Sequence, residues 1–439
     1  MSKTYFLDLF GCAKNQVDAE TLMSYLNDAG WTSTLSAEEA DLVVVNSCGF
    51  IETAKRESIN ATLEHKKNGK RVVLAGCLAE RYAKDLFESL PEADVIFGVK
   101  DLSKIASAAE SARRGTRTRI VPPPTNNNVR KNRPLLSLPG SAYVKITEGC
   151  NNRCSFCSIP LIRGGLKSRQ IEDIVDECQT LLDRGVRELC LVGQDVAAFG
   201  MDFSSKQLLP TLLEALSCLN GDFWTRLLYL HPDHFPPILD FLKEDGGARF
   251  LPYFDIPFQH ASKSLLQKMN RKGCAEDYLA LLARIRDALP SAVIRSTFLL
   301  GFPGETDADV ETLLDFQEKA RLDWAGCFTY SREENTPAYA MKPRVHKNAA
   351  ERRKALVEEK QIAITERRLE RFVGREFDVL VEEAIDEELY LGRMFAQAPE
   401  VDGAVVVHAD AALKLGSFVR CKITARAGFD LTAEILSPP

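Results

Sequence analysis

The 439-residue sequence lacks the features that mark membrane and exported proteins. No apolar run approaches the roughly 20 residues that a membrane-spanning helix needs, so we expect no membrane partner. The first ten residues enter a strand pattern at once, without the basic and then apolar leader of a secreted chain. We therefore expect a cytoplasmic protein, in which the twelve cysteines serve as metal ligands and buried thiols rather than disulfides.

The sequence also lacks a second cysteine or histidine pair at zinc-finger spacing to complement Cys150, Cys154 and Cys157, a C-x3-C-x2-C group. A structural zinc ion needs four ligands. Three thiolates on one loop can instead hold three irons of a 4Fe-4S cluster and leave the fourth iron without a protein ligand. That open iron can chelate S-adenosylmethionine and pass an electron into its sulfonium. With an aromatic residue before the last cysteine, the group resembles the signature of the radical S-adenosylmethionine (SAM) superfamily.

Strand-like and amphipathic stretches alternate over about the first 112 residues, which predicts a parallel sheet with helices on both faces. Cys12, Cys48 and Cys77 each follow a predicted strand. Ligands in open α/β sheets gather at the carboxyl ends of strands. A single cysteine there is usually a small buried residue, but three in the same register predict a second 4Fe-4S cluster, again with an open iron.

Three motifs around these cysteines, residues 11–16, 46–51 and 76–81, resemble those of the methylthiotransferase N-terminal domain. In that family the corresponding cysteines hold a sulfur-donating cluster, beside the radical cluster. The resemblance therefore implies two 4Fe-4S clusters and SAM as cofactors.

The central part of the chain contains about six strand–helix units, which predict an incomplete (β/α) barrel with its chemistry at the carboxyl ends of the strands. Gly193 and Gln194 follow the second strand and resemble the superfamily's contact to the amino group of SAM. Arg295 lies in a later strand, and Gly304 lies in the turn after it, where backbone can approach a nucleoside closely. The alternatives are plain turns for the glycines and an ion pair for Arg295.

Residues 113–140 carry seven basic side chains and neither Asp nor Glu, and runs of proline (122–124) and asparagine (126–128) interrupt them. This composition predicts an extended, solvated connector between domains. Contact with RNA phosphate is the alternative, and we treat it as secondary.

The last 70 residues show five short strands with glycine turns, typical of a small antiparallel β-barrel, and resemble the TRAM module of RNA-modifying enzymes. From Phe372 onward there are 12 acidic and 6 basic residues, a net charge of −6. Binding to a phosphate backbone needs the opposite sign, so this charge favours a basic polypeptide partner. The alternative is that the acidic stretch at 382–388 is only a solvated turn.

We thus predict an α/β protein with three domains. They are a parallel-sheet domain (1–118), a partial (β/α)6 barrel of the radical SAM type (136–367) and a small antiparallel TRAM-like barrel (370–439).

One group of methylthiotransferases modifies an adenosine of transfer RNA, and another modifies an aspartate of ribosomal protein uS12, which is very basic. The acidic barrel and residues 48–51, 76–81 and 158–164 resemble the second group. The resemblance implies that one SAM methylates a sulfur of the N-terminal cluster and a second is cleaved at the barrel cluster. The resulting radical takes a hydrogen from the aspartate β-carbon, which then collects the methylthio group.

The electron for this cleavage is expected from a donor such as flavodoxin or ferredoxin. Two alternatives remain open at this point: the transfer-RNA enzyme, and a non-catalytic iron–sulfur or zinc assembly factor on the ribosome.

Overall fold

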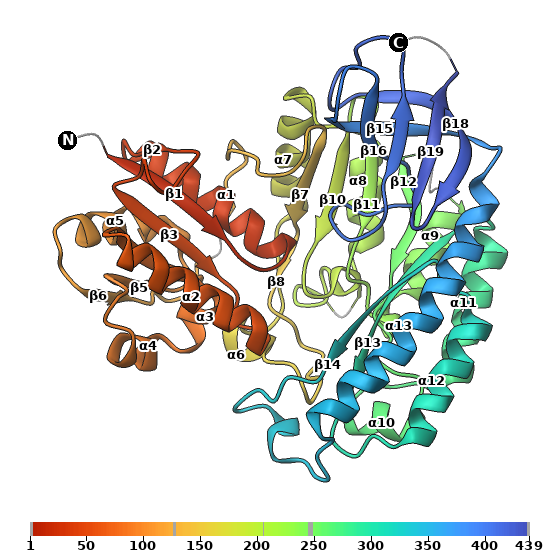
Figure 1. Cartoon of the computed structure of the whole chain (residues 1–439), viewed down its shortest axis with the longest axis horizontal. Coiled ribbons are helices and arrows are strands. Elements are labelled where there is room, and N and C mark those ends of the chain that lie inside the picture. Colours follow the sequence, from red (N-terminus) through yellow and green to blue (C-terminus); the bar gives the residue numbers. More distant parts are fainter. Residues whose placement is uncertain (1–2, 126–128, 205, 245–248, 437–439) are drawn as a thin grey trace.

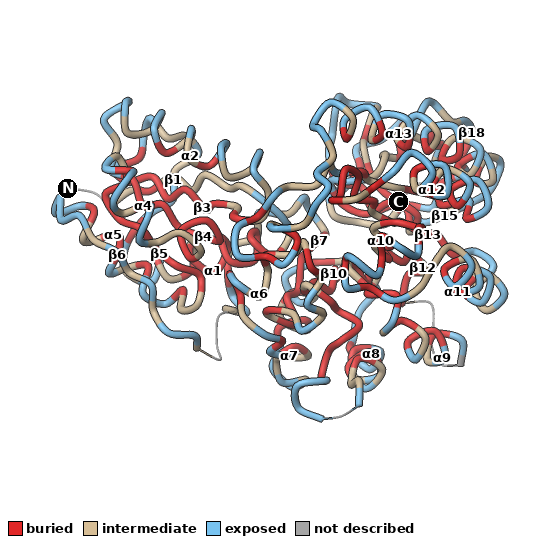
Figure 2. The backbone as a smooth tube through the Cα atoms, turned by 90° about the horizontal axis from the view of Figure 1, so that it is seen from below, coloured by how far each residue is buried: buried red, intermediate tan, exposed pale blue. Residues whose placement is uncertain are grey.

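The computed structural model describes residues 3–125, 129–204, 206–244 and 249–436. An N-terminal α/β unit lies beside a half-open barrel, and a small β-barrel covers one end of that barrel (Figure 1). In Figure 2 the strands of both parallel sheets run as buried paths, with exposed positions on the surrounding helices and loops.

The N-terminal unit is a six-stranded, all-parallel sheet in the order β2-β1-β3-β4-β5-β6. Strand β3 (Leu42–Ser47) is fully buried because helices cover both faces of the sheet. Its uninterrupted run of valines is typical of a strand buried on both sides. The strands are β1 (Thr4–Leu9), β2 (Thr32–Ser33), β3 (Leu42–Ser47), β4 (Arg71–Gly76), β5 (Val95–Phe97) and β6 (Thr118–Ile120). The helices are α1 (Ala13–Asp28), α2 (Glu52–Lys67), α3 (Cys77–Arg81), α4 (Ala83–Ser89) and α5 (Ile105–Arg113).

The central unit confirms the expected six strands, all parallel, in the order β14-β13-β12-β11-β10-β7. They are β7 (Ser141–Lys145), β10 (Glu188–Val192), β11 (Trp224–Leu227), β12 (Phe250–Asp255), β13 (Val293–Leu300) and β14 (Trp324–Thr329). The covering helices are α7 (Ile171–Asp183), α8 (Leu209–Ser217), α9 (Pro236–Glu244), α11 (Ala275–Ala288), α12 (Asp307–Ala320) and α13 (Lys347–Leu369).

Four short elements of the central unit were not anticipated from the sequence: β8 (Thr147–Glu148), β9 (Lys167–Ser168), α6 (Ile159–Arg163) and α10 (Lys263–Lys268). They are too short for a periodic pattern. Two of them flank the C-x3-C-x2-C loop, with β8 before it and α6 after it.

The C-terminal unit is the expected closed barrel, in the order β15-β16-β17-β19-β18. Its strands pair antiparallel except for β17 and β19, which run parallel. The strands are β15 (Glu376–Ala384), β16 (Leu389–Arg393), β17 (Val405–His408), β18 (Phe418–Ala427) and β19 (Asp430–Ile435).

This small barrel packs against the amino-terminal ends of the central strands. Trp224, which begins β11, lies 4.3 Å from Phe418 between ring centroids, and the Trp324 indole donates to the carbonyl of Ala396 at 2.8 Å. Glu188, which begins β10, accepts from both Arg226 and Arg393. The opposite, carboxyl-terminal end of the central sheet therefore stays available for chemistry.

The basic connector departs from the expectation of a solvated linker. Arg133 is fully buried: it donates to Glu20 of α1 at 2.8 Å, to Glu177 of α7, and to the carbonyl of Tyr143 at 2.6 Å. Because the connector contains no Asp or Glu, Arg133 pairs with acidic residues of both neighbouring domains and joins them. The asparagine run 126–128 lies outside the described residues.

None of the helices in the described parts of the chain combines the length and the apolar character that crossing a bilayer requires.

Candidate functional site

The carboxyl-terminal edge of the N-terminal sheet faces the corresponding end of the central barrel, with α1 beside β7 and α3 beside α6 (Figure 1). Cys12 precedes α1, Cys48 follows β3, and Cys77 begins α3 directly after β4. The three turns approach each other very closely. A Cβ at Gly11 would lie 3.3 Å from the Cβ of Cys48, and one at Gly49 would lie 2.7 Å from the Cys77 carbonyl. The three cysteines, here called the N-terminal trio, therefore converge.

Asn15 and Asn46 tie these turns together, a role that sequence reasoning missed. The Asn15 amide donates to the carbonyls of Phe10 (2.9 Å) and Ser47 (3.0 Å), and its oxygen accepts from the Cys77 thiol at 3.2 Å. Asn46 donates to the carbonyl of Asn15 at 2.8 Å. The only sequence signal was that both residues fall within the family motifs.

Arg163, at the end of α6, reaches from the central barrel into the N-terminal trio. Its guanidinium donates to Cys77 Sγ at 3.1 Å, to Asn15 Oδ1 and Asp18 Oδ2 at 2.8 Å, and to Glu148 Oε1 at 2.7 Å. Lys145 of β7 pairs with the same Asp18 and Glu148. A buried ion network thus joins the two domains at the trio.

Electrostatics distinguish the three thiols. Burial opposes ionisation of Cys12, but Lys14 and Arg163 outweigh it, and its pKa falls below the usual value. Burial raises the pKa of Cys48, and it raises that of Cys77 to about 12 although Arg163 acts against it. Ligation to iron would supply the positive charge that the two buried thiols lack.

Cys150, Cys154 and Cys157, here called the barrel trio, lie on one loop between β8 and α6. Backbone bonds fix the loop: Cys150 N donates to Gly164 O at 3.2 Å, and Ser155 N donates to Met269 O at 2.9 Å. Arg271 Nη1 lies 3.7 Å from Cys154 Sγ. Burial raises the pKa of Cys150 to about 11 and that of Cys157 to about 12.

Within the described chain, no group of three or more His, Cys, Asp or Glu side chains is gathered to hold a single metal ion. A cubane cluster does not need such a group, because each thiolate binds a different iron. Three thiolates in each trio are the number of protein ligands that a 4Fe-4S cluster with one open iron requires.

Two of the four predicted SAM contacts, Gly193 and Gln194, sit beside unsatisfied polar atoms after β10. Both polar atoms of the Gln194 amide are buried without a hydrogen-bond partner, as is Thr147 Oγ1. A Cβ at Gly193 would collide with that hydroxyl. Orphaned polar atoms in a tight polar cradle fit a bound polar ligand.

The adjoining Asp195 links this cradle to the barrel-trio loop. It accepts from the Asn152 amide at 2.8 Å and lies 2.7 Å from His234 Nδ1.

Gly304, another of the four predicted SAM contacts, has φ of +82°, and its amide donates to the Pro343 carbonyl at 2.7 Å.

Arg295 is engaged differently. It pairs with Asp402, in the loop between β16 and β17, and the Tyr253 hydroxyl donates to the same carboxylate at 2.6 Å. No contact among the described residues joins Arg295 to Gly193 or Gln194. Its role toward SAM stays a prediction.

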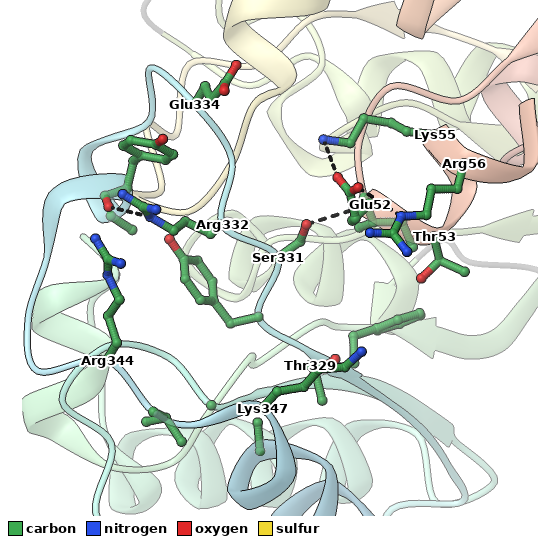
Figure 3. A pocket seen from close by; sticks show the side chains of 18 of the residues that line it. Glu52, Thr53, Lys55, Arg56, Thr329, Ser331, Arg332, Glu334, Arg344 and Lys347 are labelled. Atoms are coloured by element: carbon green, nitrogen blue, oxygen red, sulfur yellow. Dashed lines mark hydrogen bonds and ion pairs between the residues drawn. The ribbon is translucent and has the colours of Figure 1, made fainter. Parts of the chain in front are cut away.

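A cavity of about 1240 Å³ opens between α2 and the segment that follows β14 (Figure 3). Lys55 of α2 pairs with Glu333 at 3.1 Å across this seam. The lining includes Ile51, three residues beyond Cys48, and Ala338, whose amide donates to the carbonyl of Ser155 at 2.9 Å. The cavity therefore borders segments adjoining both trios.

Three family models match successive parts of the chain: "Uncharacterized protein family UPF0004" over residues 4–98, the Radical SAM superfamily over 144–316, and the TRAM domain over 373–436. Curated relatives named ribosomal protein uS12 methylthiotransferase RimO match nearly end to end. The protein of Treponema denticola is 46% identical over 97% of this chain and 99% of its own length. That of Thermotoga maritima is 40% identical over 98% and 99%.

Solved structures share the fold at low identity. The radical SAM methyltransferase TsrM from Kitasatospora setae, with cobalamin and a [4Fe-4S] cluster bound, superposes with a TM-score of 0.52 at 16% identity over 77% of each chain. The cobalamin-dependent enzyme OxsB, with S-adenosylmethionine bound, gives 0.52 at 12% identity over 83% of this chain and 56% of its own.

The fold, the two trios and these matches define an enzyme of the radical SAM methylthiotransferase class, as the motifs predicted. Within that class, the chain belongs to the family of ribosomal protein uS12 methylthiotransferases, RimO.

Proposed function

We propose that this protein adds a methylthio group to the β-carbon of an aspartate of ribosomal protein uS12. The observation that carries the proposal is the near full-length match, at 46% identity, to a relative with that named activity. The convergence of two cysteine trios at one domain seam supports it. The comparisons favour neither the transfer-RNA enzyme nor the non-catalytic assembly factor.

The proposed cofactors are two 4Fe-4S clusters and SAM. Cys12, Cys48 and Cys77 would hold one cluster, and Cys150, Cys154 and Cys157 the other. Gly193, Gln194, Gly304 and Arg295 are the proposed SAM contacts. When bound, these groups supply hydrogen abstraction from an unactivated C–H bond and the sulfur that is transferred.

The chain's own residues would position these groups and exclude water. Arg163, held by Asp18 and Glu148, fixes the turn of Cys77 against the barrel. Asp195 fixes the barrel-trio loop through Asn152. Because an unactivated C–H bond offers no proton to a base, no acid–base pair is assigned.

The C-terminal barrel is proposed to attract the basic substrate through one hairpin. Glu382 was expected to contribute but is buried, where Arg393 donates to its carboxylate. Glu383 near the end of β15, and Asp386, Glu387 and Glu388 in the turn that follows, are exposed and form no ion pair among the described residues. Their field suits a polypeptide rich in Lys and Arg.

The cavity of Figure 3 is the proposed entry for the substrate loop, since it exceeds the usual size of a small-molecule pocket.

A cytoplasmic location and an electron donor such as flavodoxin or ferredoxin are also part of the proposal. The proposed domains are 1–118, 136–367 and 370–439, and the pairing of β6 with β5 supports extending the first to Ile120.

Anaerobically reconstituted enzyme, SAM, a reductant and purified uS12 test the function directly. Mass spectrometry should find a methylthio group on one aspartate, and 5'-deoxyadenosine should form with it. A parallel reaction with transfer RNA in place of uS12, digested to nucleosides afterwards, is the control. Methylthio-adenosine there, with uS12 unmodified, would transfer the proposal to the RNA enzyme.

A further inference from the structure

Lys14, the second residue of α1, is a largely buried lysine. It keeps 7% of its surface exposed, and its ammonium forms no hydrogen bond or ion pair with any described residue. Its nitrogen instead lies 3.3 Å from the centroid of the Tyr229 ring. A ring face attracts an ammonium but offers it no hydrogen-bond acceptor.

The other buried cations are satisfied. Six of the eight buried Lys and Arg side chains in the described chain pair with carboxylates: Arg133, Lys145, Arg163, Arg226, Arg353 and Arg393. Arg271 contacts Cys154 Sγ and donates to the carbonyl of Pro257 at 2.6 Å. Lys14 alone in this group forms no ion pair and donates no hydrogen bond within the described chain.

The surroundings of Lys14 place it where the two domains meet. It lies two residues after Cys12, and its ring partner Tyr229 lies just beyond the carboxyl end of β11. Tyr229 has φ of +61°, a costly conformation for a non-glycine residue, of the kind retained at functional sites. Asp255, at the end of β12, accepts from the Tyr229 amide at 3.2 Å through one oxygen, and its other oxygen is buried without a partner.

Lys14 acts on the N-terminal trio only through its charge, which together with that of Arg163 lowers the pKa of Cys12. Arg163 donates to Cys77 Sγ at 3.1 Å, whereas Lys14 donates to no sulfur. An ammonium held against a ring beside the trio, at the ends of the barrel strands, is instead suited to an incoming anion.

We propose that Lys14 binds the carboxylate of the aspartate side chain that the protein modifies. This inference rests on the proposed function, which makes the substrate an acid. The carboxyl carbon is bonded directly to the β-carbon, so holding the carboxylate fixes the reacting C–H group to within one bond. Lys14 is then a specificity-determining residue that selects an aspartate over its amide or a neutral side chain.

The test is a double-mutant cycle on binding, read with cluster-loaded enzyme. The dissociation constant of uS12 is measured for wild type and for Lys14→Met, each with Asp and with Ala at the target position. Lys14→Met should weaken binding of the Asp form by about tenfold or more, the size of a close charge pair, and should leave the Ala form unchanged.

Two further variants serve as matched controls. Lys14→Arg keeps the charge and should retain the preference for the Asp form. Lys66→Met removes a lysine of α2 that pairs with Asp94 at 2.8 Å, and it should bind both forms like wild type. Iron and sulfide content and the electron paramagnetic resonance spectrum should match wild type in all three variants.

Equal weakening of the Asp and Ala forms in Lys14→Met overturns the inference. Loss of the N-terminal cluster in both Lys14→Met and Lys14→Arg also overturns it. Weaker binding of SAM by Lys14→Met, with binding of uS12 unchanged, overturns it as well. Failure of the proposed function looks different, because wild type would then leave uS12 without a mass increase. A persisting Asp-dependent coupling in that case would uphold the carboxylate site while rejecting the reaction.

Discussion

The two cysteine trios have the same composition but are built in opposite ways. The barrel trio sits on one loop of eight residues and takes its cation, Arg271, from its own domain. The N-terminal trio is assembled from three strand ends, and its cation Arg163 comes from the neighbouring barrel. One site is therefore local and self-contained, whereas the other depends on sheet topology and on domain docking.

The largest effects should come from removing a ligand of either trio. Cys48→Ala and Cys154→Ala should both abolish methylthiolation of uS12, because each removes one thiolate of a three-thiolate site. Only Cys154→Ala should also abolish formation of 5'-deoxyadenosine. Cys218→Ala, an exposed cysteine outside both trios, is the control and should behave as wild type. Substantial activity in Cys48→Ala would remove the sulfur-donor cluster from the scheme.

The second effect tests whether the N-terminal trio depends on the barrel. Arg163→Met leaves Asp18 and Glu148 with one cation fewer and should cost about 3 to 5 kcal/mol of stability. Anaerobic thermal unfolding measures this loss of stability. The electron paramagnetic resonance signal of the N-terminal cluster should change, while that of the barrel cluster should not. Arg271→Met should give the reverse spectral pattern. If either substitution changed the signals of both clusters equally, the N-terminal trio would not depend on the barrel more than the barrel trio does.

A third effect concerns the opposite end of the central barrel, remote from both trios. Burial opposes ionisation of Glu188, but Arg393 and Arg226 outweigh it and lower its pKa to about 2. A carboxyl with a depressed folded-state pKa contributes stability above its unfolded value, near 4.3, and loses it as the pH falls toward 2. Tryptophan fluorescence during acid titration should follow this loss. Glu188→Gln should be less stable at neutral pH but should show a flatter response between about pH 4.5 and 2.

The smallest effect should come from the exposed acidic hairpin. Neutralising Glu383 and Glu387 to Gln should weaken capture of uS12 a few-fold at low salt, with little effect at high salt. Neutralising Glu376 and Asp378, which already pair with Arg420, is the matched control and should change capture less. Tighter capture of RNA with activity on it would instead favour the transfer-RNA enzyme.

The sequence predicts the local features of this molecule better than the contacts between its domains. The barrel trio was recognisable because its spacing is local, and the N-terminal trio because each cysteine follows a readable strand. The contacts of Arg163, Lys14 and Arg133 were not predictable, since their partners are distant in sequence. Glu382 illustrates another limit: the register shift between Val381 and Glu383 breaks the alternation of β15 and turns an expected surface acid inward.

Because Arg163 extends from α6 into turns belonging to another domain, the N-terminal trio and its cation together span more of the chain than the domain that carries the three cysteines. A chimera that grafts residues 1–118 onto a relative would receive this guanidinium from its host. Transplanting the site with its own cation means moving α6 as well.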